Sequence, residues 1–85
     1  MYYVYVLKSR KDRKFYVGYT SDIRKRLKLH NDGKVESTKY RKPFELIYFE
    51  AGLNKEDAIK REKYLKTTYG YRYIRNRLKN YLDFS

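Results

Sequence analysis

The chain has 85 residues, enough for one domain with a small core, and it carries 22 lysines and arginines against 10 acidic residues, a formal net charge of +12. So strong a positive charge on a small body attracts polyanions, which makes nucleic acid the first candidate partner, an anionic membrane surface the second and an acidic protein the third. The absence of cysteine excludes disulfides and thiolate metal sites, and a single histidine excludes a multi-histidine zinc centre. No apolar run approaches the roughly 20 residues that span a bilayer. Since nothing resembles a signal peptide, we expect one domain over residues 1–85, in the cytoplasm and not at a membrane.

Two short segments near the start, residues 2–8 and 14–20, predict paired strands because they are rich in aromatic and β-branched residues. The polar stretch between them is long enough to reverse the chain, so we expect a hairpin. Side chains alternate along a strand, and the hairpin therefore brings Tyr5 and Tyr16 side by side. Gly18 weakens its strand, which predicts a bulge or a close approach by backbone or ligand at that point.

The next element is a helix, which residues 20–22 introduce because their side chains accept hydrogen bonds from the free N–H groups of a first turn. It ends at His30 or one residue later, where an Asn-Asp-Gly sequence supplies a glycine that can adopt a positive φ. Ile23, Leu27 and His30 follow the spacing of one inward stripe. Arg26 lies on the flank of that stripe.

The rest of the chain alternates between loop, strand and helix. Residues 34–43 are polar and basic and predict a loop, and residues 44–51 predict a third strand whose imperfect alternation does not show which face is the core. Two helices follow, over about residues 55–66 and 71–82, with Gly70 separating them. The order β-β-α-β-α-α predicts an α+β fold, with a three-stranded antiparallel sheet flanked by helices.

Glu62 stands out on the second of these predicted helices. It lies four residues after Ala58 and three before Leu65, within the inward stripe. A carboxylate facing inward is costly unless a charged group meets it, which makes Glu62 a candidate functional residue. The alternative is a surface ion pair with Lys66 or Arg61, a contact that contributes little.

Two motifs and two helical positions together form a known pattern. Its members are Tyr5 in a Tyr-Val-Tyr motif, Tyr16 in a Tyr-Val-Gly motif eleven residues later, Arg26 on the first helix, His30 one turn on, and Glu62 on the later helix. With these residues the chain resembles the GIY-YIG nuclease superfamily, specifically its small, single-domain bacterial members. It departs from the family pattern at Tyr3, which stands where the first motif opens with glycine, and the spacing assigns the family's late asparagine to neither Asn76 nor Asn80.

The resemblance implies a divalent-metal-dependent endonuclease that hydrolyses phosphodiester bonds in DNA, with a role in DNA repair or recombination. In such an enzyme Glu62 holds a single Mg²⁺ or Mn²⁺ ion that contacts the scissile phosphate. One of the two tyrosines, Tyr5 or Tyr16, takes or relays a proton from the attacking water, and Arg26 stabilises charge on the phosphoryl oxygens. His30 completes the set of catalytic candidates.

Each candidate also has a structural interpretation. Tyr5 and Tyr16 can be ordinary cross-strand aromatic neighbours, which stabilise a hairpin by roughly 0.2–1 kcal/mol. Arg26 can be one more solvated helix charge. His30 can be a helix-end imidazole that interacts with the helix dipole.

Two basic segments are candidates for nucleic-acid contact, one in the predicted loop and one in the last helix. Their cations are Lys39, Arg41 and Lys42 in the first and Arg72 and Arg75 in the second. Tyrosines lie among them, and rings that stack on bases beside cations that follow phosphates suit a nucleic-acid groove. The charge alone therefore also supports a non-catalytic basic nucleic-acid-binding module. A basic module for an acidic protein or membrane surface is the third hypothesis, and the protein partner stays unknown.

Overall fold

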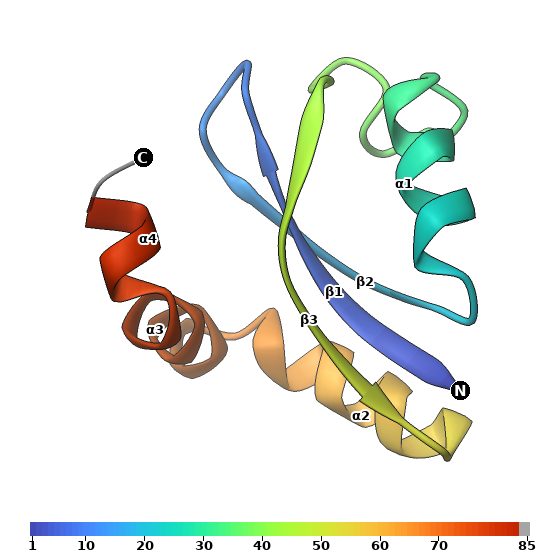
Figure 1. The fold of residues 1–85 in the computed structure, drawn as a ribbon, viewed down its shortest axis with the longest axis vertical. Helices are drawn as coiled ribbons and strands as arrows, with labels where there is room; N and C mark the ends of the chain where they lie inside the picture. Colours follow the sequence, from blue (N-terminus) through green and yellow to red (C-terminus); the bar gives the residue numbers. More distant parts are fainter. Residues whose placement is uncertain (84–85) are drawn as a thin grey trace.

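The computed structural model describes residues 1–83, so the predicted domain of residues 1–85 ends with two residues outside the described range. Its strands are β1 (Tyr2–Ser9), β2 (Phe15–Thr20) and β3 (Phe44–Gly52), and its helices are α1 (Ile23–Asn31), α2 (Lys55–Leu65), α3 (Thr68–Arg77) and α4 (Lys79–Asp83). The strands form one antiparallel sheet in the order β2-β1-β3 (Figure 1). The predicted α+β fold, a three-stranded antiparallel sheet flanked by helices, is confirmed.

Helices cover both faces of the sheet, with α1 on one side and α2 and α3 on the other (Figure 1). Because side chains alternate along the central strand β1, Val4 and Val6 pack against α2 and α3. Tyr5 and Leu7 point the other way and pack beside α1. The sheet thus separates a larger aliphatic core from a smaller aromatic one, and the two tyrosine motifs contribute to both.

Helix α1 begins and ends where the sequence predicts. The Asp22 side chain caps its start by accepting a hydrogen bond of 3.0 Å from the Lys25 backbone N–H. Gly33, just beyond its end, has a φ of 74°. At its last residue, the Asn31 side chain bonds both backbone groups of Phe44, at 2.6 and 3.1 Å. The end of α1 is therefore tied to the start of β3, which fixes the helix over its face of the sheet.

The imperfect alternation of the third strand has a structural cause. The register between β1 and β3 shifts after Val6, which pairs with Tyr48, while the next residue, Leu7, pairs with Leu46. Ile47 is the extra residue of this bulge, and it packs with Tyr48 on the face covered by α2 and α3. Leu46 packs on the other face, so β3 contributes to both cores.

The end of the chain differs from the prediction in two ways. Gly70 does not separate two helices but lies in the first turn of α3, whose N-cap Thr67 accepts a hydrogen bond from the Gly70 N–H at 3.1 Å. A Cβ at position 70 would collide with the backbone of Tyr64 and Leu65, so glycine is there to let α3 approach the end of α2. The single helix predicted over residues 71–82 is instead divided at Leu78 into α3 and α4, because Leu78 leaves helical geometry where it packs beside the core.

Across residues 1–83, none of the helices combines the length and the apolar character required to cross a membrane.

Candidate active site

Tyr5 lies at the centre of the predicted catalytic residues. Its ring points from β1 toward α1 and is only 3% exposed. Its hydroxyl lies 2.9 Å from His30 Nε2 and accepts a hydrogen bond of 3.4 Å from Arg26 Nε. The structure therefore brings three of the five predicted residues into direct contact, from two elements that are separated by the whole of β2.

Gly18 makes the position of Tyr5 possible. The two residues are opposite one another in the register of β1 and β2, and the Tyr5 ring lies over the glycine. A Cβ at position 18 would stand 2.6 Å from Tyr5 Cζ and would also collide with the hydroxyl. The register through Gly18 is regular, so the predicted bulge is wrong, and what approaches the glycine closely is the Tyr5 side chain rather than the backbone or ligand that the sequence predicted.

His30 is fully buried between rings and hydroxyls. Its imidazole makes edge contacts with Tyr5, Tyr16 and Phe44 at centroid distances of 5.8, 5.0 and 5.8 Å. Burial, followed by the positive charge of Arg26, lowers the pKa of His30 to about 4. This shift favours a neutral ring at pH 7 and does not support the interpretation of His30 as a charged partner of the helix dipole.

The other nitrogen of His30 contacts Thr38, a residue that the sequence did not single out. Nδ1 lies 2.8 Å from the Thr38 hydroxyl, which is also fully buried and lies 3.5 Å from the Val35 carbonyl. We assign the protons so that every donor meets an acceptor: Arg26 donates to Tyr5, Tyr5 donates to Nε2, Nδ1–H donates to Thr38, and Thr38 donates to Val35. Thr38 then selects the tautomer of His30 that can receive the Tyr5 proton.

The pKa of Tyr5 reflects these surroundings. Burial raises it above the ordinary value of a phenol, the hydrogen bond from Arg26 opposes that effect, and the nearby Tyr16 and Glu62 raise it further. Tyr5 is thus a protonated donor at neutral pH. Glu62 belongs to α2, which packs on the opposite face of the sheet from α1, and it makes no direct contact with Tyr5, His30 or Arg26 among the described residues.

Tyr16 is the more accessible of the two motif tyrosines. Its ring is half-buried and lies 6.4 Å from that of Tyr5, centroid to centroid. Within residues 1–83 its hydroxyl makes no hydrogen bond, in contrast to that of Tyr5. Tyr16 is therefore free to bond a water or a phosphate oxygen.

Glu62 occupies the flank of α2 nearer to β2. Its carboxylate is 19% exposed and pairs with Lys66 at 3.0 Å, the surface partner that the sequence offered as an alternative. Within the described part of the chain, no group of three or more His, Cys, Asp or Glu side chains could hold a metal ion, so Glu62 would act as a single carboxylate ligand. Mg²⁺ prefers hard oxygen ligands, keeps several waters and shares substrate phosphates, and the donor set therefore fits Mg²⁺ or Mn²⁺ completed by phosphate and water.

Arg26 also lines a cleft of about 320 Å³ at the open end of the sheet. The cleft lies where β1 begins, β2 ends and α2 begins, and its lining is Tyr2, Tyr19, Thr20, Ser21, Arg26 and Lys55. Two cations thus face a common hollow. A phosphate placed in this cleft would meet Arg26 and Lys55, whereas Tyr16 and Glu62 do not line it.

The predicted nucleic-acid residues of the loop have different surroundings. Arg41 donates to Asp12 at 2.7 Å and to the Phe15 carbonyl at 3.3 Å, and it holds the pKa of Asp12 well below its usual range. It therefore fixes the loop to the hairpin. Lys39 pairs with Glu36 at 3.2 Å, whereas Lys42 is exposed.

The predicted nucleic-acid residues of the last helix, Arg72 and Arg75, are exposed on α3. Arg75 donates to the hydroxyl of Tyr71 at 3.4 Å.

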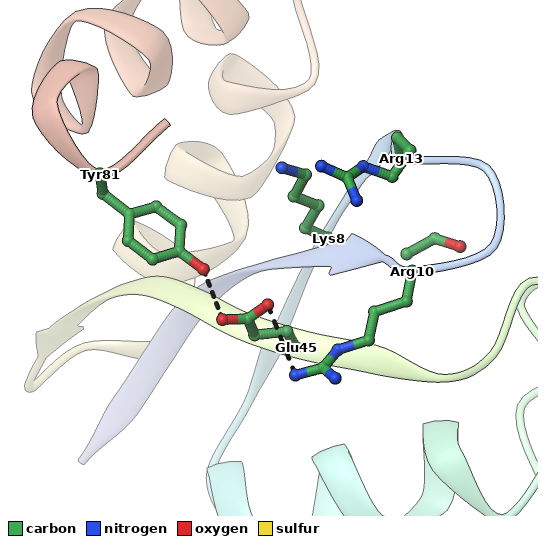
Figure 2. Close-up of a pocket in the computed structure, with 6 residues that line it drawn as sticks. Lys8, Arg10, Arg13, Glu45 and Tyr81 are labelled. Carbon is green, nitrogen blue, oxygen red and sulfur yellow. Dashed lines mark hydrogen bonds and ion pairs between the residues drawn. The ribbon is translucent and has the colours of Figure 1, made fainter. Parts of the chain in front are cut away.

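A further basic hollow of about 420 Å³, which the sequence analysis missed, lies at the hairpin end of the sheet (Figure 2). Lys8 and Arg13 line it, and Glu45 there pairs with Arg10 at 3.8 Å and accepts a hydrogen bond from Tyr81.

The burial of His30 predicts a pH dependence of stability. An imidazole with an ordinary pKa of 6.5 when unfolded and about 4 when folded takes up a proton more readily in the unfolded chain. The free energy of unfolding should therefore fall as the pH drops from 7 to 5, by about 2 kcal/mol, and this contribution should be complete above pH 7. Urea unfolding at pH 7.5, 6 and 5 measures it, and the chain has only one histidine to titrate in this window.

Direct titration checks the same prediction. The single imidazole should titrate near pH 4 by proton NMR, and Arg26→Gln should raise that midpoint because it removes the positive charge that disfavours protonation. Arg24→Gln, an exposed neighbour on α1, should leave the midpoint unchanged. A midpoint near 6.5 in the parent chain would show that His30 is not buried as described.

Known proteins similar to this chain support one assignment. The family model described as the GIY-YIG catalytic domain matches residues 1–76. UPF0213 protein YazA of Bacillus subtilis (strain 168) is 47% identical over 66 residues, which are 76% of this chain and 66% of YazA. UPF0213 protein CPE1444 of Clostridium perfringens (strain 13 / Type A) is 46% identical over 67 residues, 78% of this chain and 71% of that protein. The chain thus spans about two thirds of the length of such relatives.

A solved structure gives the same result. The solution NMR structure of the UPF0213 protein BH0048 from Bacillus halodurans superposes with a TM-score of 0.53 at 35% identity and covers 87% of this chain and 82% of that one. The likeness therefore extends over most of both chains. Since the family model spans residues 1–76 and the relatives share nearly half of their aligned residues with it, this chain belongs to the GIY-YIG family.

Proposed function

We propose that this chain is a divalent-metal-dependent endonuclease that hydrolyses phosphodiester bonds of DNA. One observation carries the proposal: the Tyr5 hydroxyl is held by Arg26 and His30, beside the ring of Tyr16. Phenols and a guanidinium gathered in this way suit proton movement and charge neutralisation at a phosphate diester. The family assignment supports the same chemistry, since the matched domain is described as catalytic.

Tyr5 and Tyr16 have different roles in this proposal. Tyr16 has an accessible hydroxyl with no competing hydrogen bond in the described chain, so it is the group that takes or relays the proton of the attacking water. Tyr5 is buried and its hydroxyl is committed to Arg26 and His30. It therefore holds Arg26 in position, and its own proton stays on the phenol in the hydrogen bond to the neutral imidazole.

Arg26 and Glu62 act on the phosphate from two sides. The guanidinium, always charged, stabilises negative charge on the phosphoryl oxygens where Arg26 lines the cleft. Glu62 holds the divalent ion, and Mg²⁺ or Mn²⁺ when bound supplies Lewis-acid polarisation of the phosphoryl oxygens and a template for the reactants. Lys66, the present partner of Glu62, is then released to face the nucleic acid.

A cleavage screen tests the proposal. Purified protein is incubated with single-stranded, nicked, branched and duplex DNA, with Mg²⁺, with Mn²⁺ or with EDTA. At least one substrate should be cut with a divalent ion and none with EDTA, and Arg26→Gln should reduce the rate by roughly 100-fold or more. If neither ion supported cleavage of any of these substrates, the proposal would be contradicted. A place in DNA repair or recombination and a cytoplasmic location stay predictions.

A non-catalytic nucleic-acid-binding module is the second candidate, and the basic hollow of Lys8, Arg10 and Arg13 favours it because those cations lie apart from the five predicted residues. In that case binding should weaken steeply as salt rises, since each neutralised phosphate releases counterions, and cleavage should be absent in the parent chain. Fluorescence anisotropy at several salt concentrations, combined with the cleavage screen, separates the two candidates.

A further inference from the structure

The outer edge of β2 carries a pocket to which the proposed chemistry assigns no ligand. In the described chain no strand pairs with this edge, because β2 is the first strand of the sheet order β2-β1-β3. The pocket has a volume of about 270 Å³ and is lined by Phe15, Tyr16, Val17, Leu65, Lys66 and Tyr71. Tyr16 is one of its walls, so the pocket directly adjoins the candidate active site.

The lining has an apolar floor, aromatic walls and a cationic rim. Val17 and Leu65 are 7% and 2% exposed and form the floor. The rings of Phe15 and Tyr71 lie 5.3 Å apart, centroid to centroid, and Tyr71 is 46% exposed although it lines the pocket. Lys66, with a half-exposed side chain, stands at the rim. An aromatic surface beside a cation is the arrangement on which nucleobases stack while their phosphates are neutralised.

We propose that this pocket binds one unpaired nucleobase of the DNA strand, next to the phosphate that is cut. The inference rests on the proposed nuclease function, which places the phosphate near Tyr16, and it names the substrate class: DNA with at least one unstacked nucleotide beside the cut. A base inside a duplex has both faces covered by its neighbours, so only an unpaired or extruded base can enter an aromatic pocket.

Charge favours a nucleobase over an apolar peptide as the occupant. Arg75 does not line the pocket, but it donates to the Tyr71 hydroxyl at 3.4 Å and lies 5.8 Å from its ring centroid, which places a second cation in contact with one of the pocket walls. The whole chain carries a net charge of +12, and a nucleotide brings its own negative phosphate. Lys66 connects the pocket to the catalytic candidates, since the same ammonium pairs with Glu62 at 3.0 Å.

Binding without cleavage tests the proposal. The probe is a short DNA single strand that contains one 2-aminopurine, a base analogue whose fluorescence falls when it stacks on a ring, and a hairpin duplex with the same analogue in a base pair is the comparison. Both are titrated in EDTA, so that turnover plays no part. We expect the parent chain to quench the single strand and to bind it more tightly than the duplex.

Substitutions on α3 test whether the single-strand binding and the quenching arise in the pocket. Tyr71→Ala should weaken single-strand binding by roughly 5- to 100-fold and abolish the quenching, because stacking on one aromatic side chain has about this value. Tyr71→Phe keeps the ring and should retain both. Tyr69→Ala removes a tyrosine of the same helix that is 70% exposed and does not line the pocket, and it should change neither.

The outcomes separate this proposal from the nuclease function. Quenching lost in Tyr71→Ala and kept in Tyr69→Ala supports the pocket, whether or not the parent chain cuts DNA. Equal affinity of the parent chain for single strand and duplex, or equal quenching by the parent chain and Tyr71→Ala, overturns it even if cleavage is found. Circular dichroism of each variant confirms that the fold is intact, and the titration of the unmodified chain needs no variant at all.

Discussion

Glu62→Gln is expected to reduce DNA cleavage by at least about 100-fold while leaving the fold and DNA binding intact. The amide keeps the size of the side chain but loses the negative charge that holds a divalent ion. Little stability should be lost, because the contact of Glu62 with Lys66 is a surface ion pair between neighbours on one helix. Single-turnover cleavage at saturating Mg²⁺ or Mn²⁺ measures the rate, and anisotropy in EDTA measures the binding.

The matched control is Glu56→Gln, which makes the same change of charge on an exposed residue in the first turn of α2. Its cleavage rate should stay within about twofold of the parent, since surface changes away from a site have small effects. If Glu62→Gln and Glu56→Gln lost activity equally, general electrostatics would explain the loss and Glu62 would have no special role. Unchanged cleavage in Glu62→Gln would remove the residue from the mechanism altogether.

Gly18→Ala should reduce both the stability of the fold and the rate of cleavage, although it adds only one methyl group. The new Cβ would stand 2.6 Å from Tyr5 Cζ, and the ring cannot swing aside freely because Arg26 and His30 hold its hydroxyl and the residue is buried. Overpacking of this kind costs about 1–3 kcal/mol of stability. Since Tyr5 also positions Arg26, cleavage should fall by roughly 100-fold, as expected for a catalytic group displaced by about 1 Å.

Gly52→Ala provides the comparison, because a Cβ at that position would have no atom within 4 Å. The variant makes the same chemical change at the end of β3 and should be neutral or slightly stabilising, through the smaller entropy of its unfolded chain. Urea unfolding measures the stability of the two variants, and cleavage assays measure their activity. A Gly18→Ala protein as stable and active as Gly52→Ala would mean that Tyr5 does not require its place over β2.

The five residues of the predicted site were accessible to sequence reasoning because their spacing encodes local structure. Two strand-like segments joined by a polar stretch predict the hairpin that carries Tyr5 and Tyr16, and a helix start signal places Arg26 on the element that follows. The contact of Thr38 with His30 could not be predicted from the sequence. Thr38 lies in a loop with no periodicity, eight residues after His30, and only the folded chain brings its hydroxyl to the imidazole. The one available hint was a threonine in an otherwise basic loop.

Other errors have equally local causes. The bulge at Ile47 reverses the alternation of β3 halfway along, so no single periodicity could assign its faces. Gly70 was interpreted as a break because glycine disfavours helices, whereas close packing against Leu65 outweighs that propensity. Arg41 has the appearance of a free loop cation in the sequence, but its partner Asp12 is 29 residues away and no spacing rule connects them.

The bidentate pair between Arg61 and Glu50 has a consequence for the neighbouring position on α2. Arg61 donates to both carboxylate oxygens of Glu50 on β3, at 2.8 and 2.9 Å. Successive residues of a helix point about 100° apart, and with Ala58 and Leu65 facing the sheet, Arg61 and Glu62 lie on opposite flanks. The bidentate pair with β3 thus fixes the rotation of α2 about its own axis. It therefore keeps the Glu62 side chain on the flank of α2 that lies away from β3.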